Sequence, residues 1–221
     1  MSQEPNAATF FNTFAETFDT IYDEKRNPFM RWVDGKFRSD MFIRYALSFE
    51  ALGQLKGSTV LDVGCGSGPY VVEAFKRGAD RVTAIDPAPN MLGLVRQRLA
   101  QAGIAGTRCE LIEGIFPDRN GVQIGPHDFA IVMGVMDYVE DPLAFLKALR
   151  PLVKRLAVVS FPSEHWFRTP FRKLRYRLRH CPVYFYNEPG IRTLGTAAGF
   201  SNVRILKIQG AGMDFHVRLE P

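Results

Sequence analysis

The feature that most constrains the fold is a regular alternation of short apolar runs and helical segments, which begins after the Gly57–Ser58 pair. The apolar runs have the length and composition of strands, and the segments between them repeat apolar residues at helical spacing. The predicted strands are residues 59–63, 81–86, 110–113, 129–133 and 156–161, and the predicted helices are residues 69–77, 90–102 and 142–149. Strands that alternate with helices predict βαβ units, and therefore a parallel sheet covered by helices on both faces.

The end of the chain completes this α/β fold. Asn187 is placed to cap a helix over residues 189–198, and two further strands follow at residues 203–208 and 215–219. The link between these two strands is too short for a crossover, so they form an antiparallel pair. The prediction is a seven-stranded, mostly parallel sheet that closes with an antiparallel strand pair.

Two segments lie outside the alternation. Apolar residues at helical spacing over residues 10–22 and 37–52 predict two N-terminal helices, so the chain divides into a helical segment of residues 1–54 and a core of residues 55–221. Within the core, residues 162–187 form an insert that contains prolines, aromatic residues and a basic cluster.

The composition excludes several classes of protein. The 221 residues are 46% hydrophobic and 23% charged, which fits a globular domain and not a disordered chain. No run approaches the roughly 18 apolar residues of a membrane span, and the first residues do not have the pattern of a secretory signal. The three cysteines, Cys65, Cys109 and Cys181, are too few for a disulfide framework and are wrongly spaced for a metal site. We therefore expect a cytoplasmic protein without a bound metal.

The most informative stretch is a predicted strand that ends in three alternate glycines, Gly64, Gly66 and Gly68. Such glycines permit backbone angles that are closed to other residues and let a ligand approach the main chain. The spacing differs from that of dinucleotide-binding loops and P-loops, and Asp62 before the glycines would repel a pyrophosphate. An acid at this place suits a ligand with an ammonium group; the alternative is a tight strand-to-helix turn without a ligand.

A second acid, Asp86, ends the next predicted strand, 18 residues after Gly68. A carboxylate at this place can accept hydrogen bonds from both hydroxyls of a ribose. The alternative is that Asp86 caps the helix that follows Pro87. The offset from the glycine turn favours an adenosine-binding site.

These motifs resemble those of the class I S-adenosylmethionine-dependent methyltransferases. Residues 62–68 match the first motif of that family, and Asp86 matches its ribose-binding acid. The resemblance covers about residues 55–161, and the closing strand pair also fits. It implies a Rossmann-like fold with S-adenosylmethionine as the cofactor, and Met91 on the next helix is expected to contact this cofactor.

The resemblance also implies the remaining cofactor contacts. Gly114, Ile115 and Phe116 lie where the family lines the adenine. The family usually has an acid directly after this glycine, so with Ile115 there we expect a backbone group to contact the adenine and Phe116 to pack on the ring. Gly134 begins the stretch after the fourth strand, where the family places methionine and catalytic contacts.

The same region does not favour nucleic acid as a substrate. Residues 134–137 stand where base N-methyltransferases carry Asn/Asp-Pro-Pro-Tyr, and no cysteine occupies the position of a C5-methylation nucleophile. The leading hypothesis is a small-molecule acceptor that is methylated at oxygen.

A further likeness is to the magnesium protoporphyrin O-methyltransferases, and it rests on Ile21-Tyr22-Asp23, the helix before the first strand and the insert. In that family the N-terminal helices form a lid, so the resemblance implies an N-terminal helical lid over residues 1–54 here. A lid tyrosine and a histidine after the fourth strand act at the reacting carboxylate in that family. Tyr22 matches the tyrosine, and Asp137 stands in place of the histidine. Asp137 is either a base that deprotonates a hydroxyl or a structural residue, and Tyr22 is either at the reacting group or in the lid core.

The positive charge of the chain is concentrated in the insert. The net charge is +5, and six of the 28 Lys and Arg residues lie within residues 168–179. A helix from Pro170 would line up four arginines beside an apolar stripe: Arg168, Arg172, Arg175 and Arg179. This pattern indicates an anionic, partly apolar acceptor or an acidic membrane surface; the alternative is a solvated surface helix.

The preferred hypothesis is therefore an S-adenosylmethionine-dependent methyltransferase for a small, anionic and partly apolar acceptor. The alternatives are an RNA methyltransferase whose basic helix contacts phosphates and a non-catalytic, cofactor-binding partner module. The identity of the acceptor, the methylated atom and the oligomeric state stay open at this point.

Overall fold

The computed structural model describes residues 41–118, 121–163, 183–208 and 214–221. Most of the predicted lid and residues 164–182 of the predicted insert lie outside the described residues.

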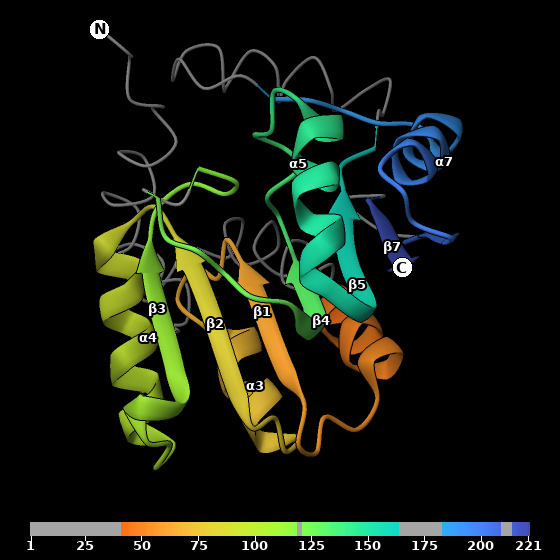
Figure 1. Ribbon diagram of the computed structural model, residues 1–221. Helices are drawn as coiled ribbons and strands as arrows, with labels where there is room; N and C mark the ends of the chain where they lie inside the picture. The colour runs from red at the N-terminus through yellow and green to blue at the C-terminus, as the bar shows by residue number, and fades with distance from the viewer. Residues whose placement is uncertain (1–40, 119–120, 164–182, 209–213) are drawn as a thin grey trace, which may run out of the picture.

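Seven strands form one sheet, which Figure 1 shows with its helices in front and behind. The strands are β1 (Thr59–Val63), β2 (Arg81–Asp86), β3 (Cys109–Glu113), β4 (His127–Val132), β5 (Val153–Phe161), β6 (Asn202–Lys207) and β7 (Phe215–Glu220). Their order is β3-β2-β1-β4-β5-β7-β6. Strands β1 to β5 pair in parallel, whereas β7 is antiparallel to both β5 and β6. The predicted seven-stranded, mostly parallel sheet with its closing antiparallel pair is confirmed.

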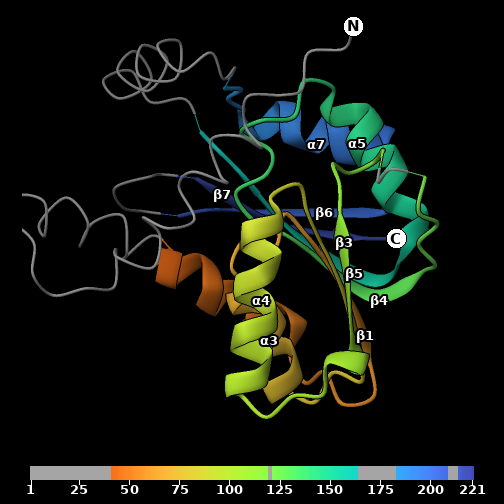
Figure 2. The same cartoon turned by 90° about the vertical axis from the view of Figure 1, so that its left-hand side faces the viewer.

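Helices cover both faces of this sheet, as Figure 2 shows. The α-helices are α3 (Pro69–Lys76), α4 (Pro89–Gln101), α5 (Pro142–Leu149) and α7 (Glu188–Ala197), with short 3-10 turns η1 (Gly106–Arg108) and η2 (Arg150–Leu152). Residues 41–52 are also helical and pack with α3 and α4 on one face, while α5 and α7 pack on the other. Among the described residues, none of the helices combines the length and the apolar character needed to cross a bilayer.

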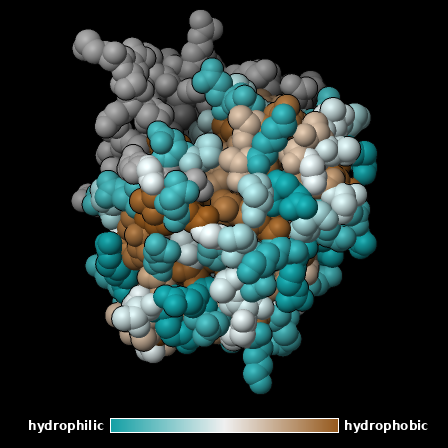
Figure 3. Space-filling view, in the orientation of Figure 1, coloured by the Kyte–Doolittle hydropathy of each residue, from teal (hydrophilic) through white to brown (hydrophobic). Residues whose placement is uncertain are grey.

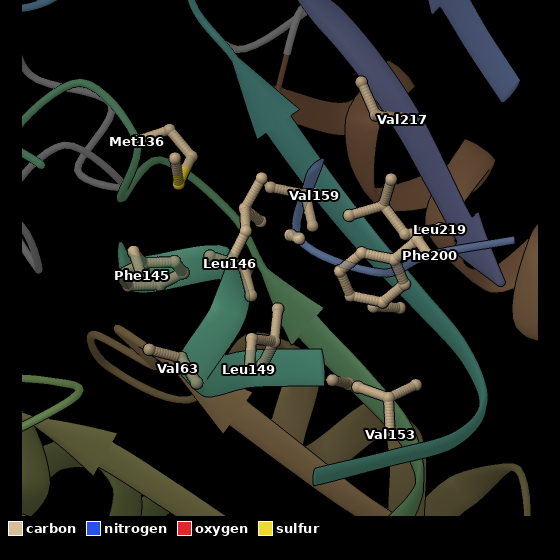
Figure 4. Close-up of a cluster of buried hydrophobic side chains, with 14 of the residues drawn as sticks. Val63, Met136, Phe145, Leu146, Leu149, Val153, Val159, Phe200, Val217 and Leu219 are labelled. Atoms are coloured by element: carbon tan, nitrogen blue, oxygen red, sulfur yellow. The ribbon is translucent and has the colours of Figure 1, made fainter. Parts of the chain in front are cut away.

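The two faces of the sheet carry separate hydrophobic cores. Side chains alternate between the faces along a strand, so Val60 packs with α3 and α4 whereas Leu61 packs with α5 and α7. Figure 4 shows Phe145 and Leu146 of α5 facing the strands. Because both faces are covered, the inner strands read as continuous apolar runs in the sequence.

Two predicted helix caps are confirmed. The Asp141 carboxylate accepts a hydrogen bond from the Ala144 amide at 2.9 Å, and the Asn187 side chain accepts one from the Gly190 amide at 2.8 Å. Each side chain satisfies a free amide at the start of its helix, which fixes where α5 and α7 begin.

Strand β5 begins three residues earlier than residues 156–161 predicted. Lys154 and Arg155 are exposed and interrupt the apolar run, which hides the start of the strand. Val153 nevertheless pairs with His127 of β4. Ladder pairing with β4 therefore extends β5 beyond its apolar segment.

The order of the strands reverses direction at β1, which has β2 on one side and β4 on the other. The connections that leave β1 and β4 pass to opposite faces, so a crevice opens beyond the carboxyl ends of these two strands. Ligands of open α/β sheets bind in such crevices.

Candidate active site

A pocket of about 490 Å³ lies at this carboxyl edge. Its wall comes from the loops that follow β1, β2, β3 and β4, together with Met41 and residues from the first turns of α3, α4 and α5. In Figure 3, drawn in the orientation of Figure 1, hydrophobic surface gathers at the level where β1, β2 and β3 end. The wall is largely apolar, with a few polar groups that converge in it.

The glycine turn after β1 forms one side of the pocket. Gly64, Gly66 and Gly68 all have positive φ angles, of 71°, 51° and 82°. A Cβ atom at Gly66 would meet no atom within 4 Å, whereas one at Gly68 would lie 2.9 Å from Val95. A Cβ atom at Gly64 would contact Val135. Gly64 and Gly66 line the pocket, and Gly68 instead allows α3 to pack closely on α4.

Asp86 lines the pocket and also holds this turn in place. One carboxylate oxygen accepts from the Gly66 amide at 2.8 Å, and the other accepts from the Ala88 amide at 2.9 Å. Burial raises the pKa of Asp86, while these two amide hydrogen bonds lower it. The helix that follows, α4, has Ala88 as its N-cap and no side-chain cap, so Asp86 holds the loop before the helix and does not cap the helix itself.

Asp62 is the second acid of the pocket wall and is 2% exposed. Its Oδ2 atom has no hydrogen-bond partner among the described residues. Burial raises the pKa of Asp62 to about 8, and the negative charge of Asp86 acts in the same direction. A buried carboxylate oxygen without a partner is costly unless a ligand satisfies it, and a cationic ligand does so best.

The loops after β2 and β3 form an apolar end of the pocket. Met91, Gly114, Ile115 and Phe116 all line it. Phe116 is buried, and its ring packs edge-on against Phe145 at a centroid distance of 4.9 Å. This end can accept a flat, apolar base.

Gly134 lines the pocket at the end of β4, with a φ angle of 74°. Its amide donates a hydrogen bond to the Ser160 hydroxyl of β5 at 2.8 Å. The sequence-predicted cofactor residues, apart from Gly68, therefore meet in one pocket.

Asp137 lies beside the pocket and is not part of its described wall. It is buried, and its carbonyl accepts a hydrogen bond from the Tyr184 amide at 2.9 Å. Burial raises the pKa of Tyr186 to about 12, and the negative charge of Asp137 also contributes. The negative charge of Asp137 thus acts on Tyr186, and the choice between a base and a structural residue at Asp137 stays a prediction. Tyr22 and the arginines of the insert (Arg168, Arg172, Arg175 and Arg179) lie outside the described residues.

The wall also contains residues that the sequence did not single out. These are Met41, Tyr70, Met133, Val139 and Glu140, among others. Of these, only Tyr70 could have been found from the sequence, because it follows the last glycine of the turn by two residues. The others meet only because separate loops converge.

The charge of the described wall is one-sided. Its ionisable acids are Asp62, Asp86, Glu140 and Asp141, and it contains no Lys or Arg among the described residues. The described residues also contain no group of three His, Cys, Asp or Glu side chains placed to hold a metal ion. The described part of the pocket therefore attracts positive charge.

The sheet order, the glycine turn and the two acids define a Rossmann-like protein of the class I methyltransferase type. A family model described as a methyltransferase domain matches residues 37–205, and the chain belongs to this family.

Curated relatives match part of the chain. The ubiquinone biosynthesis O-methyltransferase of Neisseria meningitidis serogroup C (strain 053442) is 36% identical over 111 residues, which are 49% of this chain and 45% of that protein. The enzyme of the same name from Xylella fastidiosa (strain 9a5c) is 37% identical over 101 residues, which are 45% of this chain and 39% of that protein. The matches thus span less than half the length of these relatives.

Solved structures match more of the chain at lower identity. The crystal structure of magnesium protoporphyrin IX methyltransferase from Synechocystis PCC 6803 with bound SAH has a TM-score of 0.74 and 20% identity, covering 97% of this chain and 98% of that chain. The same protein with bound SAM has a TM-score of 0.73 and 19% identity, covering 100% of this chain and 99% of that chain. This likeness shows the fold.

S-adenosylmethionine is the cofactor of this family, and the pocket residues fit it. The unpartnered Asp62 oxygen suits the ammonium group, and Asp86 suits the ribose hydroxyls. The open space at Gly66 allows the ligand to approach the main chain, and the surroundings of Phe116 suit the adenine.

Proposed function

We propose that this chain is an S-adenosylmethionine-dependent methyltransferase that methylates a small molecule, most favourably at oxygen. The observation that carries the proposal is the convergence of the glycine turn, Asp86 and the unpartnered Oδ2 atom of Asp62 in one pocket at the carboxyl edge of the sheet. When bound, the cofactor supplies an electrophilic methyl group on a sulfonium.

The residues of the pocket contribute alignment and the exclusion of water. Gly66 leaves room for close approach of the ligand, and Asp86 accepts hydrogen bonds from a diol. Met133 and Val135 present an apolar wall beside the end of β4. Methyl transfer of this kind is a direct displacement, and the protein lowers its barrier mainly by holding the donor and the acceptor in line.

We propose a partly apolar acceptor because Met41, Met133 and Val139 belong to the described wall. The proposal that the acceptor is anionic rests on the arginines of the insert, because the charged residues of the described wall are all acids. Association with an acidic membrane surface rests on the same arginines. The anionic acceptor and the membrane association are therefore both tested by substitutions in the insert.

The test is to incubate the purified chain with methyl-labelled S-adenosylmethionine and a cell extract, and then to identify the labelled product. The proposal expects a labelled small molecule that carries a new methoxy or methyl ester group. Label in RNA would support a nucleic-acid methyltransferase instead. Binding of the cofactor without any labelled product would support a non-catalytic partner module.

The arginines are tested on the acceptor that this experiment identifies. Arg172→Gln with Arg175→Gln should raise the KM for the acceptor, or reduce binding to anionic vesicles, without changing the affinity for the cofactor. The matched control is Lys76→Gln with Arg81→Gln, which removes two exposed cations away from the pocket. Equal behaviour of the two double variants would make the insert arginines a solvated surface.

A further inference from the structure

The loop that follows β4 forms one side of the pocket. Its pocket-lining residues include Met133, Gly134, Val135, Tyr138 and Val139. The base end of the pocket lies beyond β2 and β3, and the acids that suit the ribose and the ammonium group belong to β2 and β1. The donor therefore extends along the sheet edge from β3 to β1. Because β4 is the next strand in the sheet order, its loop borders the side that remains for the acceptor.

Ser160 of β5 holds the start of this loop. The pairing of β4 with β5 ends at Val132 and Val159. Just beyond it, the Gly134 amide donates a hydrogen bond to the Ser160 hydroxyl at 2.8 Å. Ser160 is buried and lies on the same face of β5 as Val158, which packs with α3 and α4. A side chain thus takes over from the strand ladder at the point where the backbone leaves the sheet.

Tyr186 holds the middle of the loop from the other face of the sheet. Its hydroxyl donates to the Met136 carbonyl at 3.1 Å, and its ring packs edge-on against Phe161 at a centroid distance of 5.0 Å. The side chains of Phe161 and Ser160 lie on opposite faces, because neighbours along a strand alternate. Burial raises the pKa of Tyr186 to about 12, so its hydroxyl keeps its proton and acts as the donor.

The backbone around Tyr186 is tied to β5 and to the loop. The Tyr186 amide donates to the Pro162 carbonyl at 2.9 Å, directly after β5, and the Tyr184 amide donates to the Asp137 carbonyl at 2.9 Å. Two consecutive carbonyls of the loop, those of residues 136 and 137, therefore accept from one short segment that is anchored to the end of β5. Ser160 and Tyr186 are themselves outside the described pocket wall, so they act on a ligand through the loop.

We propose that Ser160 and Tyr186 are positioning residues for methyl transfer, which hold the loop over residues 133–139 from opposite faces of the sheet as the acceptor side of the pocket. This inference rests on the proposed function. Its physical reason is alignment, because a shift of about 1 Å in the reacting geometry can lower a rate about 100-fold.

The first test is Tyr186→Phe, which keeps the ring on Phe161 and removes only the hydroxyl. The assay uses methyl-labelled S-adenosylmethionine and the small-molecule fraction of a cell extract. The initial rate of transfer at saturating donor should fall about 5- to 100-fold. The calorimetric affinity for S-adenosylmethionine should stay within about threefold of wild type, because Tyr186 holds the acceptor side of the pocket.

The second test is made at Ser160. Ser160→Ala should lower the same rate by a similar factor, and Ser160→Thr, which keeps an accepting hydroxyl, should recover at least about a third of the wild-type rate. The matched control is Thr83→Val, which removes a buried hydroxyl of β2 that donates to Glu110 and lies outside the described wall. Thr83→Val should lower the melting temperature like Ser160→Ala and leave the rate unchanged.

Several results would overturn the inference. Wild-type rates in folded Tyr186→Phe and Ser160→Ala would show that the loop does not need these two hydroxyls. An equal loss of rate in Thr83→Val would reduce the effect to general stability, and a Tyr186→Phe chain that loses donor affinity as much as rate would place its effect on the donor side. These results leave the proposed function intact if the wild-type chain transfers methyl groups to a small molecule, whereas a wild-type chain that transfers none would refute both.

Discussion

Substitution of Gly66 by alanine separates the effect of backbone strain from that of a blocked ligand site. Gly66 has a φ angle of 51°, and an added Cβ would meet no atom within 4 Å. Gly103, at the end of α4, has a φ angle of 68° and also meets no atom within 4 Å, but it does not line the pocket. The two alanine variants therefore carry similar strain and differ in their distance from the ligand.

The expected magnitudes follow from this geometry. A left-handed residue other than glycine costs about 1–2 kcal/mol, so each variant should lower the melting temperature by about 2–8 °C. The Cβ at Gly66 would occupy space that the ligand needs, and overpacking of about 1–3 kcal/mol corresponds to a loss of affinity of about 5- to 150-fold. Gly66→Val should abolish binding.

Thermal melting and titration with S-adenosylmethionine measure the two effects separately. Gly103→Ala should melt like Gly66→Ala and bind like the wild-type chain. If Gly66→Ala also bound like the wild-type chain, the glycine turn would not contact the ligand, and the assignment of the cofactor to this turn would be refuted.

Three further predictions address the buried polar groups. Because the pKa of Asp62 is raised to about 8 in the free protein and a nearby cation favours the ionised form, affinity for S-adenosylmethionine should rise from about pH 6 to about pH 8 and then level off. Asp62→Asn should remove this dependence in calorimetry, and a flat wild-type profile would contradict it. Ser48→Ala leaves His216 without its hydrogen bond and should cost about 1–3 kcal/mol in urea unfolding. Thr193→Ala removes a similar bond to a carbonyl four residues earlier at an exposed site and should cost about 0.5 kcal/mol or less, and equal costs would argue against the buried network. Asp137→Asn should keep turnover within about tenfold, because Asp137 lies outside the described wall, and a loss of about 10²–10⁴-fold would identify it as the base.

The fold was largely predictable because strong local signals divide the chain. Glycines or prolines mark most strand ends, and Asp141 and Asn187 cap the helices where their side chains indicated. The start of β5 was not predictable, since Lys154 and Arg155 interrupt its apolar pattern while the ladder with β4 continues. Pairing with a neighbouring strand is not encoded in a local window.

The site was predictable to the extent that one short motif carries it. Asp62, Gly66 and Asp86 were identified by their spacing, and the structure brings them together. Two properties of these residues depended on three-dimensional contacts. These are the hydrogen bonds by which Asp86 holds the turn, and the lack of a partner for the Asp62 Oδ2 atom within the part of the chain that the structure describes.

The place of Tyr70 in the pocket wall was hidden for a related reason. Its ring is positioned by residues of the helical segment 41–52, which the sequence predicted only as part of a lid. The convergence of distant segments on one pocket has no counterpart in local periodicity.

The most direct test of the central claim is calorimetric titration of the wild-type chain with S-adenosylmethionine, followed by competition with S-adenosylhomocysteine. The account predicts one binding site per chain, full competition between the two ligands, and loss of the binding heat in Gly66→Val but not in Gly103→Ala. Absence of binding by a folded wild-type chain, or binding that Gly66→Val leaves unchanged, would contradict it.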